Sequence, residues 1–153
     1  MSKIITTNVT INAAVDAVWQ ALTDLDGYRR WNPFITAAAG TFGVGERLDL
    51  TMHPPGGRAM NFRPWVTAVE HHRYIEWLGR LGMPGIFDGR HSFTLTATAS
   101  GRTLLQQSET FSGALIPFSG SLLTRTRAGF QAMNEALAHE ANCLSTHRPD
   151  PVD

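Results

Sequence analysis

Apolar residues recur at helical spacing near the start of the chain. Four of them fall at i, i+3, i+4 and i+7, which predicts a short helix with one buried face. They are Val15, Val18, Trp19 and Leu22. Asn12 stands just before this stripe, where its side chain is expected to cap the first turn. The helix therefore presents one apolar face to a core.

A second, tighter turn follows this helix. Leu25, Tyr28 and Trp31 repeat a three-residue step, which is typical of a short helical turn. Pro33 then forces the chain into an extended conformation. Two short helices are thus expected between the first strand and the rest of the protein.

The middle of the chain alternates short apolar runs with turn signals, which predicts strands. The turns include residues 43–45 and 54–57, which are rich in Gly and Pro. The expected strands are residues 3–11, 34–42, 47–53, 59–70, 74–79, 87–98 and 103–111. We expect these strands, about seven in number, to form one curved antiparallel sheet.

The C-terminal region predicts one long helix, from about residues 119–121 to about residue 145. Its apolar residues step by three and four and form a narrow stripe. They are Phe130, Met133, Leu137, Ala141 and Leu144. The fold class is therefore α+β, with the curved sheet wrapped around the long helix. A gap between such a sheet and a single helix is a common place for an apolar ligand.

Several short motifs along the chain resemble the START-like or SRPBCC superfamily, and within it the polyketide cyclase/dehydratase-like branch. They are Val18-Trp19, Asp24-Leu25, Trp31-Asn32-Pro33, Gly89-Arg90-His91-Ser92-Phe93 and Glu109-Thr110-Phe111-Ser112-Gly113. The resemblance runs from about Ile4 to about Leu144 and implies the helix-grip fold. It leaves the chemistry open, because the superfamily includes lipid carriers, hormone receptors, cyclases and proteins that assist chaperones.

The charge balance argues against a polyanionic partner. Thirteen basic side chains face thirteen acidic ones, and only 17% of the residues are charged. We therefore expect no nucleic-acid partner and no membrane insertion, since no long apolar run is present either. One cysteine and the lack of an apolar leader favour a cytoplasmic location. Residues 1–146 are expected to form one domain and residues 147–153 a flexible tail.

Most signatures of cofactor and metal chemistry are missing from the sequence. The Gly43-Val44-Gly45 segment lacks a following helix and indicates a hairpin turn instead of a phosphate loop. His71 and His72 are neighbours whose side chains should diverge, and no further ligand completes a metal site. We therefore expect no cofactor and no metal.

Two ionisable residues are expected to face the interior from adjacent strands. His91 shares a strand face with Phe93, and Glu109 shares one with Phe111. A three-residue hairpin loop, Ala99-Ser100-Gly101, closed by Thr98 and Arg102, places His91 directly opposite Glu109. A loop shifted by one residue makes them diagonal neighbours, and a two-residue loop places them on opposite faces. The alternative role for the pair is structural: two polar side chains that satisfy each other and fix the strand register at the edge of the cavity.

We predict that the protein binds a small, largely apolar or aromatic molecule. The predicted ligand-binding residues are Trp31, Phe34, Trp77, Met83, Phe87, His91, Phe93, Glu109, Phe111, Phe118, Phe130 and Met133. The glycine-rich segment 79–89 is either a lid or a permanently packed loop. Two other functions stay open: a cofactor-free cyclase or dehydratase with His91 and Glu109 as candidate catalytic residues, and an interaction module resembling chaperone-ATPase activators. The sequence does not indicate an oligomeric state.

Overall fold

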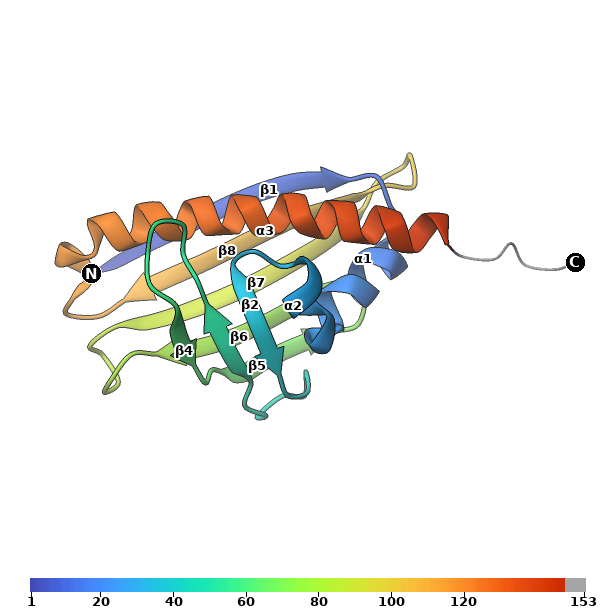
Figure 1. The fold of residues 1–153 in the computed structure, drawn as a ribbon. Helices are drawn as coiled ribbons and strands as arrows, with labels where there is room; N and C mark the ends of the chain where they lie inside the picture. The colour runs from blue at the N-terminus through green and yellow to red at the C-terminus, as the bar shows by residue number, and fades with distance from the viewer. Residues whose placement is uncertain (148–153) are drawn as a thin grey trace, which may run out of the picture.

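The computed structural model describes residues 1–147 and shows a sheet crossed by one long helix (Figure 1). The helical elements are α1 (Val15–Thr23), the 3-10 turn η1 (Leu25–Gly27), α2 (Tyr28–Trp31), the 3-10 turn η2 (Ile116–Phe118) and α3 (Gly120–Thr146). The strands are β1 (Ser2–Ile11), β2 (Ile35–Ala39), β3 (Asp49–Met52), β4 (Met60–Phe62), β5 (Trp65–Glu70), β6 (Tyr74–Arg80), β7 (Asp88–Ala97) and β8 (Thr103–Ser112). The predicted helix-grip arrangement is confirmed.

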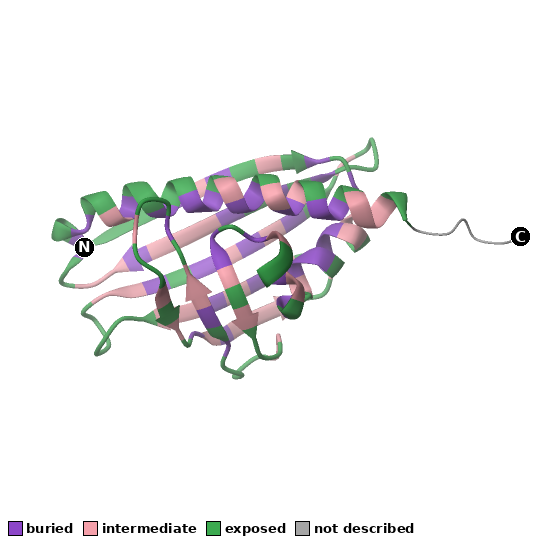
Figure 2. Cartoon of the chain, in the orientation of Figure 1, coloured by how far each residue is buried: buried purple, intermediate pink, exposed green. Residues whose placement is uncertain are grey.

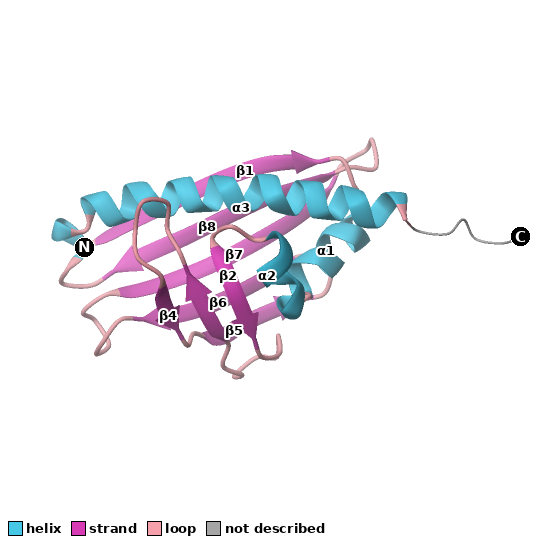
Figure 3. Ribbon diagram, viewed as in Figure 1, coloured by secondary structure: helices cyan, strands magenta, loops and turns pink. Residues whose placement is uncertain are grey.

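The strands form two antiparallel sheets instead of the single sheet expected. One sheet has five strands in the order β1-β8-β7-β6-β5, and the other has three in the order β2-β3-β4 (Figure 3). The difference arises within residues 59–70, which we expected to form one strand. Pro64 lacks the backbone N–H that a central strand needs, so β4 ends at Phe62 and β5 begins at Trp65. β4 then pairs with β3, while β5 pairs with β6.

The long helix α3 packs its apolar stripe onto β1, β8 and α1. Phe130, Met133, Leu137 and Ala141 are fully buried, and Leu144 is half-buried. Buried positions alternate along β7 and β8, so only one face of the large sheet turns toward the helix (Figure 2). Gly129 is needed in this packing, because a Cβ there would lie 2.3 Å from the Phe34 ring. The Phe34 ring therefore rests directly on the helix backbone.

The corner after α2 is held by Asn32. Its Oδ1 accepts hydrogen bonds from the backbone N–H of Phe34 at 3.0 Å and of Ile35 at 2.9 Å. This fixes the direction in which β2 leaves the corner. The expected cap of α1 is wrong: the helix is preceded by Ala14 without a side-chain cap, and Asn12 is exposed. The helix begins two residues later than an Asn12 cap requires.

None of the helices within residues 1–147 is long and apolar enough to cross a membrane. His147 forms a turn after α3, and the rest of the predicted flexible tail, residues 148–153, lies outside the described residues.

Candidate functional site

The β7–β8 hairpin brings His91 and Glu109 together as direct cross-strand partners. Its loop is closed by Thr98, whose N–H donates to the carbonyl of Arg102 at 2.8 Å. Gly101 supplies the left-handed conformation that this loop requires, with φ at +77°. The three-residue loop and the register predicted from it are both confirmed. The two registers that we left open do not occur.

His91 is completely buried and is held on all sides. Its ring stacks on Trp77 with centroids 4.7 Å apart, and the Phe130 ring meets it edge-on at 4.8 Å. Its Nδ1 lies 3.2 Å from Oε2 of Glu109, and its Nε2 lies 3.1 Å from Nε2 of Gln107. With the Gln107 amide nitrogen as donor, Nε2 of His91 accepts and Nδ1 carries the proton. The Nδ1–H then donates to the Glu109 carboxylate.

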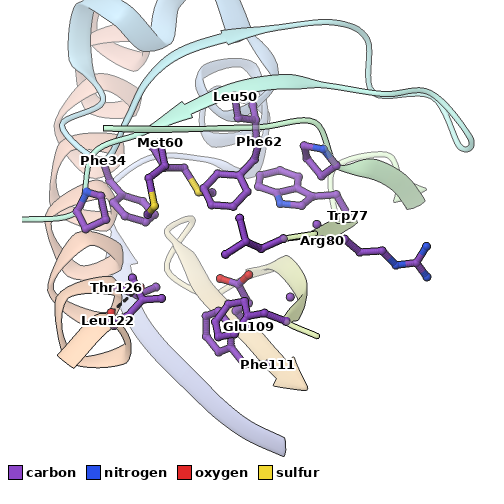
Figure 4. A pocket seen from close by; sticks show the side chains of 17 residues that line it. Phe34, Leu50, Met60, Phe62, Trp77, Arg80, Glu109, Phe111, Leu122 and Thr126 are labelled. Carbon is purple, nitrogen blue, oxygen red and sulfur yellow. Dashed lines mark hydrogen bonds between the residues drawn. The ribbon is translucent and has the colours of Figure 1, made fainter. Parts of the chain in front are cut away.

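An apolar pocket opens next to this pair. Its walls come from β6, β7 and β8 on one side, from β3 and β4 on the other, and from the first turns of α3 (Figure 4). The lining residues are Phe34, Leu50, Met52, Pro54, Met60, Phe62, Pro64, Trp77, Gly79, Arg80, Leu81, Phe87, Gly89, Glu109, Phe111, Leu122 and Thr126. The empty space between the walls is about 610 Å³ when the open mouth is included.

Three lining residues carry a polar side-chain group other than an indole. Arg80 forms an ion pair with Asp88 at 3.6 Å, and its guanidinium points away from the pocket centre (Figure 4). The Thr126 hydroxyl donates to the carbonyl of Leu122 at 2.9 Å. Glu109 is different, because its carboxylate points toward the middle of the apolar ring of side chains (Figure 4). The Glu109 side chain is 12% exposed.

The structure places five of the predicted site residues in the pocket lining: Phe34, Trp77, Phe87, Glu109 and Phe111. Four more are buried but absent from the lining: His91, Phe93, Phe130 and Met133. The remaining three lie elsewhere. Trp31 packs its ring on Tyr28 with centroids 5.0 Å apart. Met83 and Phe118 are 73% and 85% exposed and line no part of the pocket.

The pocket wall formed by β3 and β4 was missed by our site prediction. Leu50 and Met52 lie on β3, and Met60 and Phe62 on β4, each pair separated by one residue. This two-residue spacing is the signal that could have found them, since such residues share one strand face. We assigned both segments to the same sheet as β6–β8, and strands of one sheet lie side by side instead of facing each other across a pocket.

A second polar cluster lies on the other face of the large sheet and is centred on Glu76. Its carboxylate accepts hydrogen bonds from Thr67, Tyr74 and Arg90 at 2.6–2.7 Å. Burial acts to raise the pKa of Glu76, but these hydrogen bonds and the Arg90 charge outweigh burial and lower it. Burial, followed by the contact with Glu76, raises the pKa of the Tyr74 hydroxyl. This cluster ties β5, β6 and β7 together outside the pocket.

The candidate site contains no set of metal ligands, since residues 1–147 hold no group of three or more His, Cys, Asp or Glu side chains placed for one ion. What the site presents is one carboxylate at an apolar surface, backed by a buried imidazole. Fold and pocket together define a helix-grip protein with an apolar pocket beneath its long helix.

The chain belongs to the family described as "Polyketide cyclase / dehydrase and lipid transport", whose model matches residues 3–141. The predicted membership of the START-like superfamily is therefore confirmed. No curated protein matches the chain.

Solved structures with the same fold share little sequence with this chain. The Zhui aromatase/cyclase from a Streptomyces species is 18% identical, with a TM-score of 0.76 over 93% of this chain and 94% of that one. A START superfamily protein from Mycobacterium smegmatis is 19% identical, with a TM-score of 0.71 over 92% and 98%. Norcoclaurine synthase from Thalictrum flavum, solved with dopamine and hydroxybenzaldehyde, is 16% identical, with a TM-score of 0.72 over 98% and 90%. At these identities the likeness shows the fold alone.

Proposed function

We propose that this protein binds a small, largely apolar molecule in the pocket between the two sheets and the start of α3. One observation carries the proposal: an open pocket of mainly apolar side chains contains a single carboxylate, Glu109, directed inward. Aromatic rings gathered around one polar group are typical of a ligand-binding pocket and not of a groove that only faces solvent. The family description, which includes lipid transport, supports the same class of ligand.

The aromatic lining favours a flat or ring-containing ligand. Phe34, Phe62, Trp77, Phe87 and Phe111 all contribute side chains to the pocket. Rings of this kind pack best against other rings at offset or edge-on geometry.

A fluorescence titration with the neutral probe N-phenylnaphthylamine tests the proposal. We expect saturable binding in the micromolar range, which corresponds to about 8 kcal/mol. Leu122→Trp should weaken binding at least about tenfold, because the larger side chain fills the pocket from α3. Leu104→Trp is the matched control, since Leu104 lies on β8 outside the lining and is 39% exposed. Absence of saturable binding, or equal loss in both variants, would contradict the proposal.

A cofactor-free cyclase or dehydratase is the second candidate, favoured by the Gln107–His91–Glu109 chain of hydrogen bonds. Glu109 is the group that touches the pocket, so it would take a proton from a carbon next to a carbonyl. His91 would hold the carboxylate through Nδ1–H. Rotation of the Gln107 amide exchanges its oxygen and nitrogen, so Gln107 is able to pair with the imidazole in either protonation state.

This second candidate is tested with hydroxyacyl and polyketone thioesters as substrates. Loss of water or ring closure, followed by mass spectrometry, should exceed the rate in buffer. Glu109→Gln should abolish turnover and retain binding of N-phenylnaphthylamine. Turnover no faster than in buffer across these substrates would remove the enzyme from consideration.

An inner pocket filled entirely by Trp, Phe and Met side chains would favour the third expectation, the interaction module. The pocket is instead open and contains a carboxylate. No observation on the outer face of the sheet favours this function over the first two.

A further inference from the structure

The pocket offers its occupant one unused hydrogen-bond acceptor. Oε2 of Glu109 receives the Nδ1–H of His91, whereas Oε1 accepts no hydrogen bond from any residue within 1–147. The carboxylate is directed into the pocket and its side chain is only 12% exposed. A carboxylate surrounded by apolar groups is costly unless its oxygens are paired. A ligand that fills the pocket and excludes water from Oε1 therefore has to provide a hydrogen-bond donor to it.

Gly89 makes this placement of the carboxylate possible. A Cβ at Gly89 would lie 2.3 Å from Oε1 of Glu109, which is closer than two non-bonded atoms approach. The carboxylate therefore lies over bare backbone, where any other residue on β7 would push it aside. The obstructed atom is the end of a flexible side chain, so an alanine at this position displaces the carboxylate without disrupting the sheet.

Neither of the other polar side chains of the pocket lining pairs with the Glu109 carboxylate or neutralises its charge. The Arg80 guanidinium is paired with Asp88 and points away from the centre, and the Thr126 hydroxyl is committed to the Leu122 carbonyl. A second carboxylate brought in by a ligand would meet the Glu109 charge with no cation between them. Like charges at close range in such surroundings repel strongly.

We propose that the pocket selects apolar molecules whose buried end carries a hydrogen-bond donor, a hydroxyl or an ammonium group, and rejects those that end in a carboxylate. This inference rests on the proposed ligand-binding function. A hydroxyl donates to Oε1 and an ammonium adds an opposite charge. The ammonium also gains from the faces of nearby rings such as Trp77 and Phe111.

Four compounds with one carbon skeleton test this selectivity: phenylbutanol, phenylbutylamine, phenylbutyrate and butylbenzene. Each is used to displace N-phenylnaphthylamine from the wild-type protein. The alcohol and the amine should bind at least about tenfold more tightly than butylbenzene, since a hydrogen bond to a charged group stabilises by more than about 1.4 kcal/mol. Phenylbutyrate should bind more weakly than butylbenzene.

Three variants assign the selectivity to Glu109. Glu109→Met should remove the preference for the alcohol and amine while the protein still binds butylbenzene. Gly89→Ala should reduce the preference without changing any charge, because it displaces the carboxylate. Gly120→Ala is the control, since nothing lies within 4 Å of a Cβ there, and it should retain the wild-type order.

The two proposals fail in different ways. If the probe does not bind, the proposed function is wrong and no selectivity exists. If the probe binds but the four compounds displace it equally, or phenylbutyrate displaces it best, the ligand-binding function stands and the selectivity for donors is overturned. A preference that survives Glu109→Met also overturns it.

Discussion

The contact between His91 and Glu109 should appear as a coupling in stability, measured by a double-mutant cycle with His91→Phe and Glu109→Met. His91→Phe keeps a ring between Trp77 and Phe130 but removes two hydrogen bonds. The bond to the carboxylate contributes about 1.5–3 kcal/mol and the bond from Gln107 about 1 kcal/mol. We therefore expect His91→Phe to lower the free energy of unfolding by about 3 kcal/mol.

Glu109→Met should lower the free energy of unfolding by less than His91→Phe does. The methionine side chain is apolar and suits the pocket wall, but the buried Nδ1–H of His91 loses its acceptor, which costs about 1–3 kcal/mol. In the double variant the same hydrogen bond is lost only once and neither partner stays unpaired. The sum of the single effects should therefore exceed the effect of the double variant by about 1–2 kcal/mol.

Urea denaturation of the four proteins at neutral pH measures this coupling. The slopes of the free energy against urea must agree among the variants, since a changed slope would indicate a different denatured or native state. Effects that add to within about 0.5 kcal/mol would refute the reasoning. The hydrogen bond seen between the two side chains would then contribute nothing to stability.

Three further predictions concern other parts of the molecule. Because the pKa of Glu76 is lowered, this carboxylate stabilises the fold above its ordinary pKa of 4.5, and the contribution is lost as the pH falls through the lowered value. Glu76→Gln should therefore reduce the fall in the free energy of unfolding toward acid pH, and an unchanged pH dependence would contradict this. The backbone amides of residues 81–87 should exchange hydrogen faster than those of β6 and β7. Their exchange should slow when N-phenylnaphthylamine binds, because Leu81 and Phe87 line the pocket. Equal exchange with and without the probe would favour a permanently packed loop. Asn32→Ala should lower the free energy of unfolding by about 1–3 kcal/mol, since Oδ1 satisfies two buried N–H groups; thermal denaturation measures this, and no shift would mean that the corner is held by other contacts.

The β7–β8 hairpin was predictable from sequence because its determinants are local. Gly101 specifies the loop, and alternation with a period of two assigns each side chain to a face. Once the closing pair of Thr98 and Arg102 is fixed, the pairing of His91 with Glu109 follows by counting. The stripe on α3 was predictable for the same reason, since it depends on helical periodicity alone.

The exposed loop residues show where this reasoning fails. Met83 lies in a loop and Phe118 ends the short 3-10 turn η2, and at neither position does a periodicity indicate the direction of the side chain. Composition therefore suggested a binding role for both, yet both are among the most exposed apolar residues within 1–147. The direction of a loop side chain depends on tertiary contacts, such as the hydrogen bonds from the N–H groups of Ala114 and Leu115 to the 85–86 backbone.

The shared strand face did not reveal which member of the His91–Glu109 pair lines the pocket. The two residues occupy paired positions on one face, but Trp77 and Phe130 cover the His91 ring, and both residues come from other elements. Glu109 lies over Gly89, whose lack of a side chain leaves room for the carboxylate. The neighbours on adjacent elements, and not the strand pattern, decide that the carboxylate faces the pocket while the imidazole lies behind it. A chemical role for this pair must therefore begin at Glu109.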